Sequence, residues 1–140
     1  MKPLPPILLV EDNPMDLDLT LRAFRKRQLA NRIEVARDGE EALAWVPRWE
    51  AGEPWPAVIL LDINLPRLTG LEVLHQLKRH PHLCRIPVVV LTSSREDSDL
   101  KTAYDLGVNA YIEKPVSFNK FLEVAEHIEQ NWCVLNERAY

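Results

Sequence analysis

The sequence predicts a doubly wound α/β fold, with a five-stranded parallel sheet and five flanking helices. Apolar runs typical of buried strands alternate along the 140 residues with stretches in which apolar side chains recur at helical spacing. Several of the apolar runs end in a polar residue, as strands do when they lead to the carboxyl edge of a parallel sheet. Right-handed crossovers between such units favour the strand order 2-1-3-4-5.

The first half of the chain carries the signals for three strands and two helices. We expect the strands at residues 7–11, 33–36 and 57–61. Asn13 caps the first helix and Pro14 fits its first turn, where the missing proline N–H has no partner to lose. The segment 38–41 (Asp-Gly-Glu-Glu) resembles a capping box and begins the second helix, which Pro47 is expected to end.

The second half supplies three more helices and two more strands, which we expect at residues 87–91 and 108–112. A capping box that starts at Thr69 begins the third helix. The fourth helix spans residues 96–106, with Ser94 as a candidate cap and Gly107 as a left-handed end. Ser117 caps the fifth helix.

Length and composition indicate one domain over residues 1–140, with a core at about 7–132 and a C-terminal extension at 133–140. The formal net charge of −4 gives no reason to expect nucleic acid or an anionic membrane as a partner. No apolar run approaches the roughly 20 residues that cross a bilayer, and no signal peptide precedes the first strand, so we expect a cytoplasmic protein. Cys84 and Cys133 are interpreted as free thiols; a disulfide between them is the alternative.

Three carboxylates are expected to meet at the carboxyl edge of the sheet. Glu11 and Asp12 directly follow the first strand, and Asp62 follows the third strand, which neighbours the first in the predicted order. Taken one at a time, they have ordinary explanations: a solvated glutamate, a helix cap and a turn cap. Taken together, crowded carboxylates repel one another, and a hard cation such as Mg²⁺ relieves the repulsion. The backbone carbonyl of Asn64 is placed to complete the metal shell.

A hydroxyl and an ammonium group are expected at the same edge. Thr92 ends the fourth strand and Lys114 ends the fifth. Alone, Thr92 fits a helix-start cluster and Lys114 an exposed lysine. Beside three acids they complete the set that a metal-dependent phosphoryl site requires, since both donate hydrogen bonds to phosphoryl oxygens. Asp62 is the predicted nucleophile, because carboxylates form aspartyl-phosphates.

These residues resemble the signature of the receiver domain of two-component response regulators. The signature is carried by Glu11-Asp12, Asp62, Thr92, Tyr111 and Lys114-Pro115, and the resemblance covers about residues 7–132. It implies a flavodoxin-like fold in which Glu11 and Asp12 bind Mg²⁺ and Asp62 is the phosphoacceptor. It also implies that Thr92 and Tyr111 form the switch pair and that Lys114 contacts the phosphoryl group.

A finer resemblance is to the single-domain, chemotaxis-regulator-like proteins associated with bacterial phytochromes. It rests on residues 8–14, 85–94 and 103–112. It implies a signalling protein that catalyses only its own phosphorylation and dephosphorylation, with a sensor histidine kinase as partner and a bacteriophytochrome as one candidate kinase. No DNA-binding domain follows the fifth helix, so we expect output through an unidentified protein target.

We also expect a homodimer through the fourth helix, the fifth strand and the fifth helix, with the conformational response on the same face. The apolar run from Trp132 to Leu135 continues past the expected core, which a solvated tail would not explain. The related phytochrome-linked regulators tend to dimerise on this face. The alternative is that the run folds back on its own domain.

The Lys114–Pro115 bond is expected to be cis, against the base rate for bonds that precede proline. The chain must leave the fifth strand, present Lys114 inward and restart at Ser117. A tight turn with a cis proline does this, and the resembled family uses one.

Two other classes of protein share parts of this pattern. A phosphatase similar to the haloacid dehalogenases would need an acid two residues after the nucleophile, where this chain has Asn64. A flavodoxin-like module for FMN would need a hydroxyl-rich phosphate loop after the first strand, where this chain has Glu11 and Asp12. The receiver-domain interpretation is therefore preferred.

Overall fold

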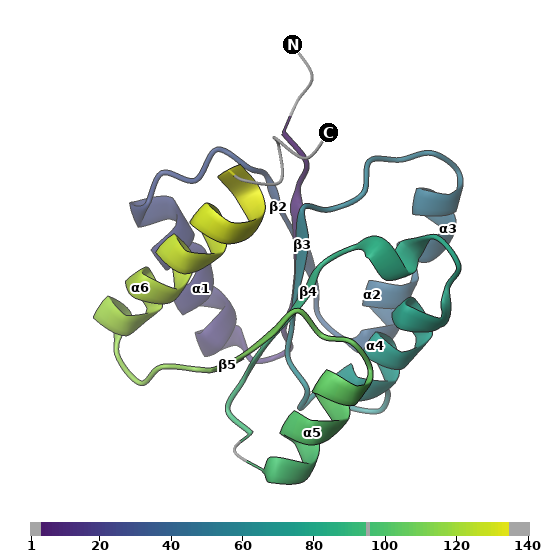
Figure 1. Cartoon of the computed structure of the whole chain (residues 1–140). Helices are drawn as coiled ribbons and strands as arrows, with labels where there is room; N and C mark the ends of the chain where they lie inside the picture. Colours follow the sequence, from purple (N-terminus) through teal and green to yellow (C-terminus); the bar gives the residue numbers. More distant parts are fainter. Residues whose placement is uncertain (1–3, 95, 135–140) are drawn as a thin grey trace.

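Five parallel strands form a single sheet at the centre of the structure (Figure 1). The structure is a computed structural model that describes residues 4–94 and 96–134. The strands are β1 (Ile7–Val10), β2 (Ile33–Ala36), β3 (Val58–Leu61), β4 (Val88–Thr92) and β5 (Ala110–Glu113). Their order is β2-β1-β3-β4-β5, which confirms the predicted topology.

Helices cover both faces of the sheet. One face is covered by α1 (Pro14–Lys26) and α6 (Phe118–Ile128), and the other by α2 (Gly39–Leu43), α3 (Val46–Glu50), α4 (Gly70–Arg79) and α5 (Asp97–Asp105) (Figure 1). A 3₁₀ turn, η1 (Leu83–Arg85), precedes β4, and a π-helical segment, η2 (Glu129–Val134), continues α6. Among the described residues, no helix has the length and apolar content needed to cross a membrane.

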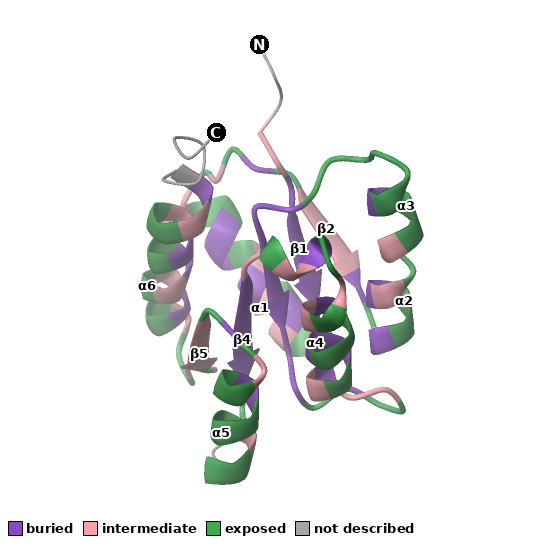
Figure 2. Ribbon diagram, turned by 45° about the vertical axis from the view of Figure 1, so that its right-hand side comes forward, coloured by how far each residue is buried: buried purple, intermediate pink, exposed green. Residues whose placement is uncertain are grey.

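The central strands are buried on both faces. In β1, Leu8 and Val10 join the core under α2 to α5, whereas Ile7 and Leu9 join the core under α1 and α6, because successive side chains of a strand point to opposite faces. Figure 2 shows the middle strands as buried and the outer faces of the helices as exposed. Truncating a buried Leu or Ile to alanine costs roughly 2–5 kcal/mol, so these two cores fix the strands that carry the site.

Four helices begin at the caps that the sequence predicts, which are Asn13, Asp38, Thr69 and Ser117. Each side chain accepts a hydrogen bond from a backbone N–H of the first turn, and Thr69 forms a complete capping box. The start of α5 differs from the prediction. Its N-cap is Glu96, and the Ser94 hydroxyl instead accepts a hydrogen bond from the Glu96 N–H at 3.4 Å.

The predicted second helix is divided into two short ones, so the described residues contain six α-helices rather than five. Pro47 does not end a helix; it lies in the first turn of α3, where no N–H is needed. The break falls just before it, because a proline inside a continuous helix would remove a hydrogen bond to the preceding turn. The strand boundaries lie within two residues of those expected.

The prediction of a cis bond between Lys114 and Pro115 is wrong, since no peptide bond among the described residues is cis. The sheet itself presents Lys114: its N–H donates to the Thr92 carbonyl at 2.8 Å and extends the β4–β5 pairing by one residue. Bends at Val116 and Ser117 then turn the chain into α6. The turn into α6 is therefore made after the proline, and a trans bond suffices.

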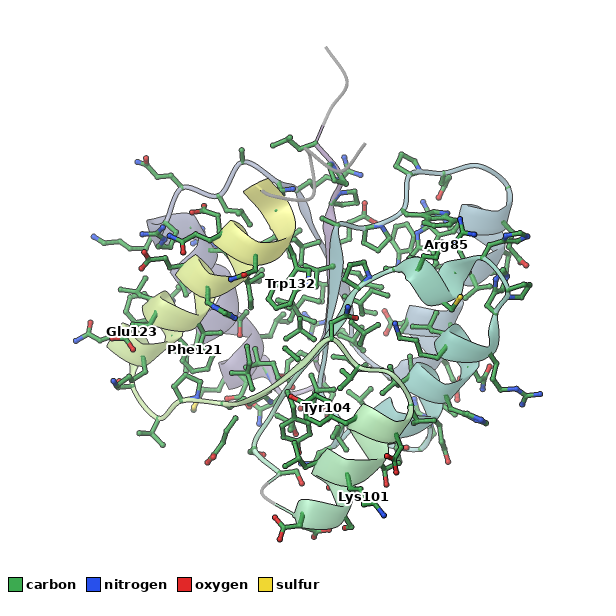
Figure 3. The ribbon with its side chains drawn as sticks, viewed as in Figure 1. Arg85, Lys101, Tyr104, Phe121, Glu123 and Trp132 are labelled. Atoms are coloured by element: carbon green, nitrogen blue, oxygen red, sulfur yellow. The ribbon has the colours of Figure 1, made fainter. Side chains whose placement is uncertain are left out.

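The C-terminal turns fold back on their own domain as far as they are described. Cys133 is 2% exposed, and Trp132, labelled in Figure 3 with Phe121, packs against the core under α1 and α6. Arg27, just after α1, forms an ion pair with Glu129 of η2 at 3.0 Å. Trp132 and Cys133, which are part of the apolar run, therefore belong to the domain's own core. Leu135 lies outside the described residues. Both cysteines of the chain are free thiols, as expected.

Candidate functional site

The carboxyl edge of the sheet brings the predicted site residues together. The register of β1 and β3 places their last residues opposite one another, so the next residues, Glu11 and Asp62, emerge side by side. The Asp62 N–H donates to the Val10 carbonyl at 3.1 Å, which fixes this spacing. Thr92 is the last residue of β4, and Lys114 directly follows β5.

Three acids form a cluster at this edge. Oxygen atoms of Glu11, Asp12 and Asp62 all lie within 4.8 Å of one another. Glu11 and Asp62 are buried, and an open pocket of ≈ 560 Å³ beside them is lined in part by Asp12 and Asn64. Carboxylate oxygens beside an open pocket suit Mg²⁺, which takes few protein ligands and keeps several waters. The donor set therefore fits a hard divalent cation.

Lys114 is surrounded by carboxylates. Its Nζ lies 2.6 Å from Glu11 Oε1, 2.8 Å from Asp62 Oδ2 and 2.9 Å from Asp16 Oδ2. An ammonium group has three N–H donors, so each carboxylate receives one. Burial would lower the pKa of Lys114, but the hydrogen bonds to these acids outweigh it and raise the pKa above its ordinary value. Lys114 is therefore a permanent positive charge in the site.

Glu11 and Asp62 are neighbours with opposite pKa shifts. Burial raises the pKa of Glu11 to about 7, because the hydrogen bond from Lys114 only partly offsets the loss of solvent. The negative charge of Asp62 also disfavours a negative charge on Glu11. Burial also acts to raise the pKa of Asp62, but hydrogen bonds from Lys114 and from the Asn64 N–H outweigh it and hold the pKa below its ordinary value. Asp62 is thus kept as a carboxylate, which is the form a nucleophile requires.

Two further donors orient Asp62. Thr92 Oγ1 donates to Asp62 Oδ1 at 2.8 Å, and the Asn64 N–H donates to the same oxygen at 3.0 Å. Lys114 donates to the other oxygen, Oδ2. Gly70 closes the loop that follows, where a Cβ would overlap the carbonyl oxygen of Asp62. The backbone packing at Gly70 therefore holds the loop that carries Asn64.

Tyr111 is linked to Thr92 through Ser94. The Tyr111 hydroxyl donates to the Ser94 carbonyl at 3.1 Å, and the Ser94 N–H donates to Thr92 Oγ1 at 3.3 Å. The Ser94 hydroxyl donates to Asp99 Oδ2, on α5, at 2.5 Å. Burial raises the pKa of Tyr111, so its hydroxyl stays a neutral donor. Ser94 therefore connects the hydroxyl partner of Asp62 with the aromatic residue of β5.

All seven predicted site residues lie at this edge of the sheet: Glu11, Asp12, Asp62, Asn64, Thr92, Tyr111 and Lys114. Two contacts are not predicted by the sequence, namely Asp16 on Lys114 and Asp99 on Ser94. In the sequence, Asp16 is an acid in the first turn of a helix, where it interacts favourably with the helix dipole. Asp16 lies four residues after Asp12, and nothing near it in the sequence indicates a contact with Lys114.

The fold and these side chains define a class: small doubly wound α/β proteins with an acidic, lysine-containing site at the carboxyl edge of the sheet. Within that class, the response regulator receiver domain is the family whose model matches residues 7–126. The chain belongs to this family.

The relatives of the chain include regulators from several sources. It is 46% identical over 131 residues to the probable methanogenesis regulatory protein FilR2 of Methanothrix harundinacea, which covers 93% of this chain and 84% of that protein. Among solved structures it is similar to the bacteriophytochrome response regulator AtBRR, at 53% identity and a TM-score of 0.74 over 92% of this chain and 95% of that one.

Two further similar structures come from cyanobacterial regulators. The phosphorylated cyanobacterial phytochrome response regulator RcpA has 39% identity and a TM-score of 0.84 over 92% of this chain and 94% of that one. The Mn²⁺-bound form of the response regulator Rcp1, a protein of Synechocystis sp., has 37% identity and a TM-score of 0.80 over 91% of this chain and 93% of that one.

These likenesses confirm the predicted family, the fold and the similarity to phytochrome-associated regulators. Membership makes the chain a signalling protein rather than a classical enzyme, which decides against the phosphatase and FMN-binding alternatives. Receiver domains bind a divalent cation at their acidic site, and the Mn²⁺-bound relative is an example.

Proposed function

We propose that the chain accepts a phosphoryl group from a sensor histidine kinase onto Asp62, with Mg²⁺ as the cofactor. The observation that carries the proposal is the environment of Asp62. The carboxylate is buried, its pKa is held low, and hydrogen bonds from Thr92, Asn64 and Lys114 orient both of its oxygens. A nucleophile that is ionised and oriented before the donor arrives is what transfer requires. The phosphorylated relative RcpA supports the assignment.

In the proposed transfer, an oxygen of Asp62 attacks the phosphorus of a phosphohistidine in line. The O–P bond forms as the P–N bond breaks, and the leaving imidazole takes a proton from solvent. Thr92 and Lys114 move their hydrogen bonds from the carboxylate to phosphoryl oxygens. Carboxylates of Glu11, Asp12 and Asp62, with the carbonyl of Asn64, would hold Mg²⁺, which supplies positive charge against those oxygens.

The proposed conformational response begins at Thr92. When its hydroxyl turns to the phosphoryl group, the Ser94 N–H follows, because it is bonded to the same oxygen. The Ser94 carbonyl holds the hydroxyl of Tyr111, so the movement reaches β5 and the helices beside it. One covalent charge thereby biases the population of two arrangements of this face.

We propose a bacteriophytochrome as the phosphodonor kinase. The support is the likeness to AtBRR and RcpA, whose names link them to bacteriophytochrome and phytochrome. The test is transfer from a purified, phosphorylated bacteriophytochrome kinase, with a sensor kinase of another stimulus as the control. Transfer that is equally fast from both kinases, or absent from the bacteriophytochrome, would argue against this partner.

We also propose a homodimer through α5, β5 and α6. β5 is an edge strand between these helices (Figure 1), and the face exposes Leu100, Tyr104, which is labelled in Figure 3, and Val116. Exposed apolar side chains on one face favour a self-complementary contact. Light scattering over a concentration series tests the dimer, with Tyr104→Asp expected to weaken it. A monomer at high micromolar concentration, with and without phosphorylation, excludes it.

Labelling with acetyl phosphate tests the phosphorylation itself. The protein is incubated with acetyl phosphate and Mg²⁺, and the site is mapped by mass spectrometry. One phosphoryl group is expected, on Asp62, and chelation of Mg²⁺ should prevent its transfer. Asp18→Asn, on the exposed side of α1, is the control that should label normally. Label retained in the Asp62→Asn variant would contradict the assignment of Asp62 as the phosphorylation site.

A further inference from the structure

One acid on Lys114 stands apart from the metal cluster. Asp16 Oδ2 lies 2.9 Å from Lys114 Nζ, as close as an ordinary charged hydrogen bond. The other two acids on Lys114, Glu11 and Asp62, belong to the cluster of three carboxylates, whereas Asp16 does not. The bond between Asp16 and Lys114 can therefore persist while the other two acids are engaged.

The backbone of Asp16 is fixed from both sides. Its N–H donates to Asn13 Oδ1 at 3.0 Å, and its carbonyl accepts a hydrogen bond from Thr20 Oγ1 at 2.7 Å. The side chain of Asp16 is 29% exposed, against 7% for that of Lys114. A short side chain on a fixed backbone is a good anchor for the flexible stem of a lysine.

We propose that Asp16 is a positioning residue that acts through Lys114. Its carboxylate keeps one N–H of the ammonium group on α1, so that the other two point at Glu11 and Asp62, where the phosphoryl oxygens arrive. The inference rests on the proposed phosphorylation of Asp62. Without Asp16, three N–H donors share two buried acids, and the ammonium group loses its single position.

The rate of phosphorylation separates positioning from charge. By charge alone, Asp16→Asn would speed the reaction, because it removes repulsion of the anionic donor. Positioning predicts the opposite: with acetyl phosphate at saturating Mg²⁺, the variant should react roughly tenfold more slowly. Asp18→Asn is the matched control, since it removes the same charge from α1 at a side chain that is 55% exposed and paired with Arg22. A rate of Asp16→Asn equal to or above that of the wild type overturns the proposal.

A double-mutant cycle shows whether Asp16 acts through Lys114. In the Lys114→Met background, Asp16→Asn should change the rate by less than about twofold, because the group it positions is gone. Slowing by the same factor in both backgrounds would mean that Asp16 acts through the start of α1 and would overturn the proposal. Thermal unfolding of each variant verifies that it is folded.

A second readout needs neither metal nor phosphodonor. Nitrogen NMR of lysine ammonium groups in the metal-free protein follows the exchange of the Lys114 Nζ protons with water. Exchange should be roughly tenfold faster in Asp16→Asn and unchanged in Asp18→Asn. Unchanged exchange in Asp16→Asn overturns the proposal. A wild type that does not label at Asp62 would instead refute the proposed function, while this readout still tests the contact between Asp16 and Lys114.

Discussion

The raised pKa of Glu11 should make the proposed Mg²⁺ binding sensitive to pH. Burial moves this carboxyl from an ordinary pKa of 4.5 to about 7. In the proposed site the cation needs Glu11 ionised, so below that pH it would compete with a proton. Between pH 8 and pH 6 the ionised fraction of Glu11 falls from about 0.9 to about 0.1, and the apparent Mg²⁺ affinity should fall about tenfold.

The same shift governs the stability of the metal-free protein. Because the folded pKa of Glu11 lies above the unfolded one, the fold favours the protonated form, and stability is lost as pH rises from 4.5 to about 7. The shift corresponds to about 3 kcal/mol. The pKa of Asp62 is lowered and that of Lys114 is raised, so both stay charged across this window and do not cancel the loss.

Calorimetric titration of Mg²⁺ at pH 8, 7 and 6, at constant ionic strength, measures the first effect. Urea unfolding with a chelator measures the second. Glu11→Gln is the matched variant, because it keeps the shape of the side chain and removes the titrating group; its metal-free stability should change little between pH 5 and pH 7. A wild type that binds Mg²⁺ equally well at pH 6 and pH 8 would refute the reasoning, since Glu11 would then be ionised throughout.

Three further predictions concern the loop, the metal ligands and the core. Gly70→Ala should destabilise the protein in urea unfolding, although alanine favours a helix over glycine by about 1 kcal/mol, because a Cβ would overlap the backbone of Asp62 and Ile63. A stabilised Gly70→Ala would contradict the overlap. Asp12→Ala should weaken Mg²⁺ binding more than Thr92→Ala, because carboxylates are the hard ligands; calorimetry that gives equal losses contradicts these roles. Phe24→Ala should cost roughly 3–5 kcal/mol in urea unfolding, since Phe24 is fully buried in the core under α1; a loss below about 1 kcal/mol would show that this core closes over the gap.

The strands and most helix starts could be predicted because their signals are local. A buried parallel strand shows as an apolar run, as in β1, and a cap such as Asn13 needs only the N–H groups of the next turn. The site residues could be predicted for a related reason. Each of Asp62, Thr92 and Lys114 sits at or just after the end of a strand, and the topology alone brings those ends together.

The features that the sequence did not predict depend on contacts between distant segments. Asp16 and Lys114 are 98 residues apart, and nothing near either residue indicates the other. The trans bond before Pro115 follows from the pairing of Lys114 with Thr92, which a local turn argument leaves out. At Pro47, the rule that proline ends a helix competed with the rule that proline starts one, and only the break before α3 decided between them.

The buried thiol of Cys133 gives the protein a chemical reporter of its own opening. Burial raises the pKa of Cys133 to about 12, so at neutral pH it is a protonated, unreactive thiol. A thiol reagent reaches it only in molecules whose η2 segment has left the core under α1 and α6. Cys84, in η1, is partly exposed and provides the internal reference. The ratio of the two alkylation rates therefore measures how often the C-terminal turns detach, in the unmodified chain and without an added probe.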